Sequence, residues 1–257
     1  MPSRKPHPLE GATILVTRPG GTAGAFLRQA RSLGARAISV PGLSLRGIDD
    51  HSARTAGPGF DDWIFTSPSA VRFGAGLLPS RRKRSHVRAF AVGEGTARAL
   101  ARHGVAASVP RDRFDSEGML ALPELRSVRG RHIAIVGAPG GRDLIAPTLR
   151  RRGARVETIH VYRREPPRLT RRHFEAIEAA DDPLLTLVSS GEALGYLVAL
   201  LPAALLERLR AQPLVVSSAR LVGIARKHGF AEIVQARSAA PRDLLAAAAG
   251  ALERHRL

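Results

Sequence analysis

The segment Asp61–Val71 reads D-D-W-I-F-T-S-P-S-A-V and decides how the rest of the chain is interpreted. Trp63-Ile64-Phe65 is a short apolar run typical of a buried strand. Thr66 and Ser67 follow this run, and Pro68 ends it, because proline has no N–H for a strand ladder and its fixed φ suits a first helical turn. The segment therefore predicts a strand, a hydroxyl-bearing turn and the start of a helix.

A turn of this kind suits an anionic group, because it offers unpaired backbone N–H groups and two side-chain hydroxyls. A Ser or Thr that only caps a helix has the same appearance. The pattern returns in Pro183–Leu194, P-L-L-T-L-V-S-S-G-E-A-L, where Ser189 and Ser190 follow a second apolar run. Both interpretations stay open for each of these hydroxyls.

Further matches indicate an internal duplication. Pro19-Gly20-Gly21 and Pro139-Gly140-Gly141 each follow a strand-like run, and Gly34-Ala35-Arg36 and Gly153-Ala154-Arg155 each close the helix after it. Such register is rarely kept by chance over several elements, so we expect a duplicated α/β module. Strands that alternate with helices predict parallel sheets, and ligands of such sheets bind beyond the carboxyl ends of the strands.

Composition bounds the class of protein. The 257 residues are 44% hydrophobic and 24% charged, which favours a globular protein with two cores rather than one. Cysteine is absent, so disulfides and Cys-based metal sites are excluded. The longest apolar runs are too short to span a membrane, and the N-terminal residues lack the apolar segment of a signal peptide. We expect a cytoplasmic protein.

The strongly basic charge does not by itself identify a partner. The formal net charge is +18, and only Lys5, Lys83 and Lys227 are lysines, so the basic residues are nearly all arginines spread along the chain. This usage indicates compositional drift rather than selection for one ligand. Aromatic residues make up only 4% of the chain, too few for a platform that stacks nucleic-acid bases. A polyanionic ligand fits the charge as well as a nucleic acid does.

Several short motifs follow one another in an order that covers nearly the whole chain. They are I-L-V-T-R-P at 14–19, I-F-T-S-P-S-A-V at 64–71, A-V-G-E-G-T-A-R-A-L at 91–100, D-S-E-G-M-L at 115–120, G-G-R at 140–142, V-Y-R-R at 161–164, S-S-G-E-A-L at 189–194 and V-V-S-S-A-R-L at 215–221. In this order the set resembles the uroporphyrinogen-III synthase (HemD) family.

The resemblance implies a fold and an activity. The fold is α/β, with two similar parallel-sheet lobes joined by a two-segment bridge and a cleft between them. Lobe 1 would combine 1–42 with 168–257, lobe 2 would be 48–160, and the linkers would lie at about 43–47 and 161–167. The residues alone also allow a simple end-to-end pair of halves. The activity is that of a cyclising lyase of tetrapyrrole (haem) biosynthesis, which converts hydroxymethylbilane to uroporphyrinogen III and inverts ring D through a spiro intermediate. No cofactor and no metal are implied.

The resemblance also implies roles for particular residues. Tyr162 matches the tyrosine proposed in this family to assist the leaving hydroxyl, and a phenol can donate a proton while staying neutral at cellular pH. A bridge tyrosine that only packs between lobes would look the same. The expected substrate-binding residues are Arg18, Thr66, Ser67, Thr96, Gly140, Gly141, Arg142, Ser189, Ser190 and Ser217.

Two other functions use the same features. A two-lobed binding protein for a small anionic ligand would use the same turns but would not need Tyr162. A basic nucleic-acid-associated protein would present one contiguous basic face. Under the family interpretation we expect a monomer that binds the linear tetrapyrrole, contacts neither nucleic acid nor membrane, and makes at most a transient contact with the preceding enzyme of the pathway.

Overall fold

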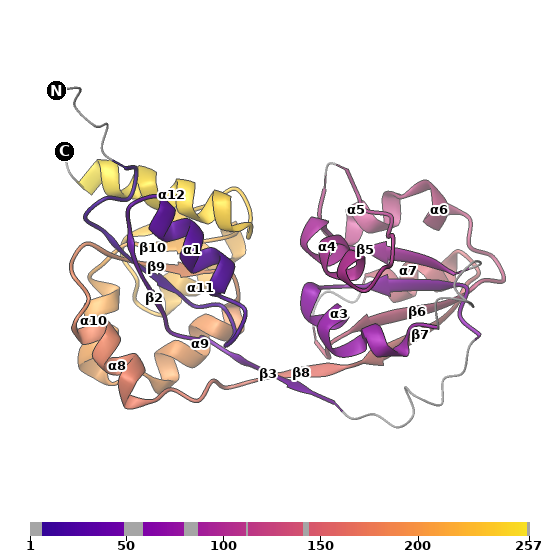
Figure 1. The fold of residues 1–257 in the computed structure, drawn as a ribbon, viewed down its shortest axis with the longest axis horizontal. Helices are drawn as coiled ribbons and strands as arrows, with labels where there is room; N and C mark the ends of the chain where they lie inside the picture. Colours follow the sequence, from indigo (N-terminus) through magenta and orange to yellow (C-terminus); the bar gives the residue numbers. More distant parts are fainter. Residues whose placement is uncertain (1–6, 49–58, 80–86, 112, 141–143, 256–257) are drawn as a thin grey trace. The chain divides into compact units, whose positions relative to one another are not determined.

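The structure, a computed structural model, describes residues 7–48, 59–79, 87–111, 113–140 and 144–255. The chain divides into two compact units, which are coloured along the sequence in Figure 1. Unit 1 comprises Met1–Leu45 and Glu165–Leu257, and unit 2 comprises Arg46–Arg164. Unit 1 is therefore built from both ends of the chain and unit 2 from its middle.

Unit 1 contains a parallel sheet in the order β11-β10-β9-β1-β2. Its strands are β1 (Thr13–Val16), β2 (Arg36–Ser39), β9 (Leu184–Val188), β10 (Leu214–Val216) and β11 (Ile233–Gln235). Its helices are α1 (Gly24–Ser32), α8 (Arg171–Glu178), α9 (Gly191–Leu200), α10 (Ala203–Arg210), α11 (Ala219–Lys227) and α12 (Pro241–His255).

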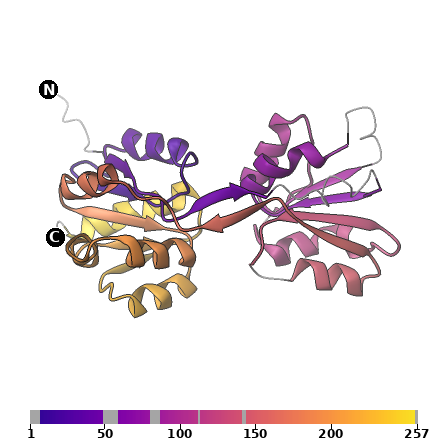
Figure 2. The same cartoon turned by 90° about the horizontal axis from the view of Figure 1, so that it is seen from below.

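Both faces of this sheet are buried. Successive side chains of a strand point to opposite faces. Ile14 and Val16 of β1 accordingly pack with α1 and α12, whereas Leu15 packs with the apolar faces of α8 to α11. Figures 1 and 2 show these two groups of helices on opposite sides of the sheet. A parallel sheet with helices on both faces is expected to have strands that are apolar over nearly their whole length, as these are.

Unit 2 contains a second parallel sheet in the order β5-β4-β6-β7. Its strands are β4 (Asp62–Phe65), β5 (Arg88–Ala91), β6 (His132–Gly137) and β7 (Arg155–His160). Its helices are α3 (Pro68–Gly74), α4 (Glu94–Arg102), α5 (Ser116–Ala121), α6 (Pro123–Arg126) and α7 (Ile145–Arg151), with a 3-10 turn at Ala75–Leu77.

Both faces of this sheet are covered as well. Ile64 packs with the core under α5, α6 and α7. Trp63 and Phe65 point to the other face, where their rings stack at a centroid distance of 6.4 Å. The predicted α/β class with two parallel-sheet units is thus confirmed.

The two segments that connect the units pair with each other. They form β3 (Ser44–Gly47) and β8 (Tyr162–Glu165), which make a two-stranded sheet of their own. The chain passes from one unit to the other within these strands, between Leu45 and Arg46 and again between Arg164 and Glu165. A hydrogen bond from the Ile48 N–H to the Val161 carbonyl, 3.0 Å, lies at the end of this pair.

Each of the two copies of the sequence repeat contributes strands to both sheets. In the repeat, β1 and β2 correspond to β6 and β7, and β4 and β5 correspond to β9 and β10. The strand orders β10-β9-β1-β2 and β5-β4-β6-β7 are therefore equivalent. Each sheet combines the first two strands of one repeat with the next two strands of the other, so neither repeat forms a unit alone.

A buried carboxylate stabilises the amino-terminal edge of the sheet in unit 2. Asp62 is fully buried, and Arg88 and Arg131 each donate two hydrogen bonds to it, at 2.6 to 2.8 Å. Burial alone would raise the pKa of Asp62, but the hydrogen bonds and positive charges of the two guanidinium groups outweigh it and lower the pKa. Three neighbouring strands are tied together in this way, because Asp62 begins β4, Arg88 begins β5 and Arg131 directly precedes β6.

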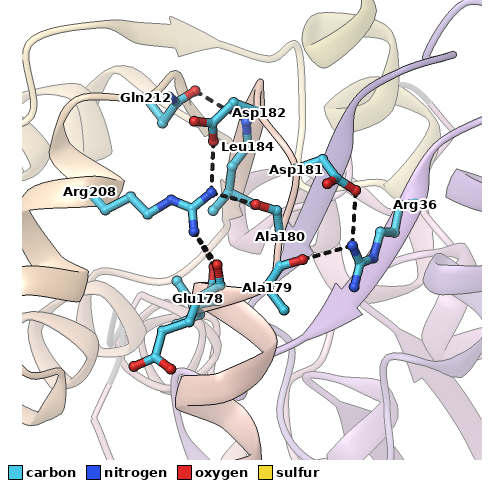
Figure 3. Close-up of polar contacts among 10 residues, drawn as sticks. Arg36, Glu178, Ala179, Ala180, Asp181, Asp182, Leu184, Arg208 and Gln212 are labelled. Atoms are coloured by element: carbon cyan, nitrogen blue, oxygen red, sulfur yellow. Dashed lines mark hydrogen bonds and ion pairs between the residues drawn. The ribbon is translucent and has the colours of Figure 1, made fainter.

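Two arginines fix the loop that leads into β9 in unit 1 (Figure 3). Arg36 donates to the Ala179 carbonyl at 2.8 Å and to Asp181 at 2.9 Å. Arg208 donates to the carboxylate of Asp182 at 3.0 Å and to three carbonyls, those of Ile177, Glu178 and Ala180. The carboxyl end of a helix leaves its last carbonyls without partners in the helix, and Arg208 bonds two of those of α8, on Ile177 and Glu178.

Candidate active site

Tyr162 and Ser67 form a hydrogen-bonded pair in unit 2. The hydroxyl of Tyr162 lies 3.1 Å from Oγ of Ser67. Ser67 is the N-cap of α3, and its Oγ accepts the N–H of Ala70 at 3.0 Å. The ring of Tyr162 stacks on that of Phe73 at a centroid distance of 5.5 Å. Only 6% of Tyr162 is exposed, so its phenol is held at both the ring and the hydroxyl.

The local sequence explains why Ser67 occupies this position. β4 ends at Phe65, and Pro68 occupies the first position of α3, where its missing N–H costs no hydrogen bond. Ser67 has an extended backbone and its side chain replaces one of the helix's missing acceptors. The predicted strand, hydroxyl turn and helix start are all present, and the hydroxyl has the cap role as well as its contact with Tyr162.

Thr66 points toward the neighbouring strand. Its Oγ1 donates to the carbonyl of Val136 at 3.1 Å. A Cβ added to Gly137 would lie 2.6 Å from this Oγ1, so the end of β6 has to be glycine for the threonine to fit. Because the hydroxyl proton of Thr66 is engaged, only the lone pairs of its oxygen remain for a ligand.

The glycine turn after β6 contacts an arginine of β8. Gly140 has a φ of +72°, which favours glycine. Arg164 donates to the carbonyl of Pro139 at 2.8 Å and to that of Gly140 at 3.2 Å. Arg164 was not among the expected site residues, although residues two apart on a strand, as Tyr162 and Arg164 are, lie on the same face. Gly141 and Arg142 lie outside the described residues.

The amino end of α4 adjoins that of α3. Gly93 is the N-cap of α4, and a Cβ on Gly95 would lie 3.6 Å from Pro68 of α3. Thr96 lies in the first turn of α4 and is only 3% exposed. The hydroxyl of Thr96 therefore lies within unit 2 rather than on its surface.

Unit 1 holds the remaining candidates at the carboxyl edge of its sheet. Ser190 is the N-cap of α9, where its Oγ accepts the N–H of Ala193 at 3.4 Å. Ser189 and Ser217 directly follow β9 and β10 and are half-buried. Ser190 thus occupies in unit 1 the place that Ser67 occupies in unit 2.

Arg18 is the positively charged member of this edge. Its Nη2 donates to the Ala239 carbonyl at 2.5 Å, and its guanidinium lies 5.8 Å from the centre of the Phe26 ring. Burial lowers the pKa of Arg18 below its usual range. Within the described part of the chain, no carboxylate lies within ion-pair distance of it. A desolvated guanidinium without a counter-charge is a suitable place for an anionic ligand.

The structure separates the candidate residues into two groups. Tyr162, Thr66, Ser67, Thr96 and Gly140 belong to unit 2, and Arg18, Ser189, Ser190 and Ser217 belong to unit 1. In the described ranges, no group of three or more His, Asp or Glu residues is placed to hold a metal ion. The helices found there are too short or too polar to cross a membrane.

The fold and these groups define a class of α/β protein with two parallel-sheet units, the first of which is discontinuous in sequence. In both units, the turns that follow the strands carry hydroxyl groups and arginines. The family model described as uroporphyrinogen-III synthase HemD matches residues 25–246. The chain therefore belongs to the uroporphyrinogen-III synthase family, whose members are cyclising lyases of porphyrin biosynthesis.

Individual relatives agree with this family. The uroporphyrinogen-III synthase of Salmonella typhimurium is 35% identical over 251 residues, which cover 91% of this chain and 99% of that protein. The Escherichia coli uroporphyrinogen-III synthase is 33% identical over 252 residues, with the same coverage.

Solved structures share the fold. The Helicobacter pylori uroporphyrinogen-III synthetase gives a TM-score of 0.65 at 13% identity, covering 93% of this chain and 99% of that one. A mutant uroporphyrinogen III synthase from Thermus thermophilus gives 0.57 at 20% identity, covering 95% and 99%.

Proposed function

We propose that this chain closes hydroxymethylbilane into uroporphyrinogen III, with inversion of ring D, and that Tyr162 assists the departure of the hydroxyl. Uroporphyrinogen-III synthase activity is supported by the family match over most of the chain and by relatives that are covered almost end to end. These matches do not favour the alternatives of a passive anion-binding protein or a nucleic-acid-associated protein. The observation that carries the catalytic role is the hydrogen bond between Tyr162 and Ser67.

The ring closure of hydroxymethylbilane requires a proton donor at the leaving hydroxyl group. The C–O bond of the hydroxymethyl group breaks, the hydroxyl leaves as water with an added proton, and an azafulvene cation remains. The substituted carbon of ring D attacks this cation to give the spiro intermediate, which fragments and recloses with ring D inverted and a proton released. No oxidation or reduction occurs, so the chain needs only to supply a proton and to hold the substrate.

Tyr162 and Ser67 suit the first step. The Ser67 oxygen accepts the N–H of Ala70, and either hydroxyl of the Ser67–Tyr162 pair can be the donor. We propose the arrangement in which Ser67 donates its proton to the phenol oxygen of Tyr162. In that arrangement the phenol proton points elsewhere and can be given to the departing hydroxyl. Ser67 then acts as a positioning residue, and Tyr162 as the catalytic acid.

The carboxylates of the substrate need separate partners. We assign them to the turns after the strands: Arg18, Ser189, Ser190 and Ser217 in unit 1, and Thr96, Gly140, Gly141 and Arg142 in unit 2. Thr66 and Ser67 lie in the same turns, but their hydroxyl protons are used by the Val136 carbonyl and by Tyr162, so we assign them to hydrogen-bond donors of the substrate and to the positioning of Tyr162. Arg18 is the strongest candidate, because its half-buried guanidinium has no acidic partner in the described residues. Thr96 is the weakest, because its side chain is buried.

The remaining expectations belong to the same proposal. We propose that the protein works as a cytoplasmic monomer with at most a transient contact to the enzyme that supplies its substrate. The lobes 1–42 with 168–257 and 48–160, with linkers at about 43–47 and 161–167, are proposed as its functional parts. The compact units divide close to these limits.

A product analysis tests the proposed function. The purified chain is incubated with freshly prepared hydroxymethylbilane, the product is oxidised, and the type III and type I isomers are separated by chromatography. Unassisted closure delivers the uninverted type I isomer, so the proposal predicts type III in excess over a protein-free control. If type I alone forms at the rate of that control, the proposed function is wrong.

A further inference from the structure

Phe114 is an exposed aromatic side chain beside the amino end of α4. It is 54% exposed, and Leu200, at 41%, is the other large hydrophobic residue exposed to this degree in the described part of the chain. Phe114 directly precedes Asp115, the N-cap of α5. An aromatic side chain contributes strongly to binding when a ligand covers it, and Phe114 has more than half of its surface left to cover.

The backbone on both sides of Phe114 is held in place. Asp115 accepts the N–H of Glu117 at 3.1 Å and that of Gly118 at 2.9 Å, and Arg113 donates to the same carboxylate at 2.6 Å. A Cβ at Gly118 would lie 1.8 Å from the Arg113 carbonyl oxygen, so the chain packs there as only glycine allows. Because its neighbours are fixed, ordering the ring of Phe114 against a ligand costs little entropy.

Phe114 lies at the same edge of unit 2 as the catalytic pair. A Cβ on Gly93, the N-cap of α4 just beyond β5, would lie 3.5 Å from the Cβ of Phe114. The next glycine of that helix, Gly95, approaches Pro68, which directly follows Ser67. A continuous path of neighbouring residues thus leads from the exposed ring to Ser67 and to the phenol bonded to it.

We propose that Phe114 is a positioning residue that packs its ring against a pyrrole ring of the bound linear tetrapyrrole. The inference rests on the proposed function, since the substrate supplies both the pyrrole and the carboxylates. The hydroxyls can bind carboxylates but cannot stack on a flat pyrrole ring, whereas an aromatic ring can. The linear tetrapyrrole must be bent for ring closure, so its pyrrole rings have to be held in place as well as its carboxylates.

Phe114→Ala tests the proposal, with Phe114→Tyr as the conservative variant and Leu200→Ala as the control for loss of an exposed apolar side chain. Initial rates with hydroxymethylbilane give KM and kcat. We expect Phe114→Ala to raise KM about tenfold, in line with the loss of one aromatic contact and its buried area, with kcat changed by less than about threefold. Phe114→Tyr is expected to restore KM, and Leu200→Ala to leave both constants unchanged.

Thermal unfolding separates binding from folding. Because Phe114 is exposed, its removal is expected to leave the unfolding midpoint of the chain unchanged. A wild-type KM in Phe114→Ala, or an increase that Phe114→Tyr fails to reverse, would overturn the inference while the synthase activity stood. A wild-type chain that yields no type III isomer would instead overturn the proposed function.

Discussion

Ser67 and Ser190 are equivalent helix caps in the two units, and they differ in one contact. Each accepts the N–H of the alanine three residues later, at 3.0 Å for Ser67 and 3.4 Å for Ser190. The Ser67 hydroxyl also lies 3.1 Å from that of Tyr162, whereas among the described residues no side chain bonds to the hydroxyl of Ser190. The duplicated fold therefore supplies the same turn twice and combines it with a phenol in one unit.

Alanine at each cap separates the two roles. Ser67→Ala and Ser190→Ala should each lower the free energy of unfolding by about 1 kcal/mol, because each removes one N-cap. Ser67→Ala should in addition lower kcat, because Tyr162 loses its positioning partner, whereas Ser190→Ala should raise KM. Denaturant unfolding and steady-state kinetics of the pair measure this. Equal effects on kcat would show that the contact with Tyr162 has no catalytic role.

Asp62→Asn tests the arginine-bonded carboxylate of unit 2. Removing the charge leaves Arg88 and Arg131 without their shared partner, and we expect the free energy of unfolding to fall by about 3 kcal/mol. The variant should unfold at a lower denaturant concentration while its product still contains the type III isomer. A stability change below about 0.5 kcal/mol would contradict this account of the cluster.

The same carboxylate predicts a pH dependence. The pKa of Asp62 is lowered in the folded chain, so its contribution to stability is present above the unfolded value of about 4 and is lost as the pH falls through the lowered folded value. Wild-type stability should therefore decline more steeply below about pH 4 than that of Asp62→Asn. Stability is measured by circular dichroism at each pH. If it declines equally with falling pH in the two proteins, the ionisation of Asp62 does not contribute to the pH dependence of stability.

Arg208→Ala should destabilise unit 1. Its guanidinium bonds three carbonyls and a carboxylate around the end of α8, and the loss should cost about 2–3 kcal/mol. Arg208→Lys should recover only part of this, because an ammonium cannot reproduce the planar fork. Arg171→Ala, which removes only an exposed ion pair, is the control and should change stability by less than about 0.5 kcal/mol.

Gly137→Ala should disturb the active site rather than the core. The added methyl would lie 2.6 Å from Thr66 Oγ1, so the turn that carries Thr66 and Ser67 must shift. We expect kcat to fall, since Ser67 would move away from Tyr162. Gly195→Ala is the matched control: nothing lies within 4 Å of its added methyl, and alanine should stabilise helix α9 by about 0.5–1 kcal/mol. Unchanged kcat in Gly137→Ala would mean that the turn tolerates the shift.

Local patterns predicted much of the fold. Trp63-Ile64-Phe65, the Ser67 cap and Pro68 each act through the backbone of their own segment, so their geometry can be derived without the rest of the chain. The second turn, ending in Ser190, follows the same rules. Parallel sheets also followed from the alternation of strands and helices, whereas the discontinuous first unit was implied only by the family resemblance.

Contacts between distant segments were not predictable in this way. Asp62 meets Arg88 and Arg131, which are 26 and 69 residues away, and nothing in their local sequence marks them as partners. Phe114 was missed because an aromatic residue looks like a core residue until its exposure is known. The pairing of strands from both repeats within one sheet likewise depends on long-range packing.

The rate of the Tyr162→Phe variant tests the central claim most directly. Phenylalanine keeps the stacking on Phe73 and removes only the hydroxyl that bonds to Ser67. In a single-turnover assay with hydroxymethylbilane, the account predicts a decrease of about tenfold or more in the rate of type III formation, with an unchanged unfolding midpoint. Type III formation at the wild-type rate by the folded variant would contradict it.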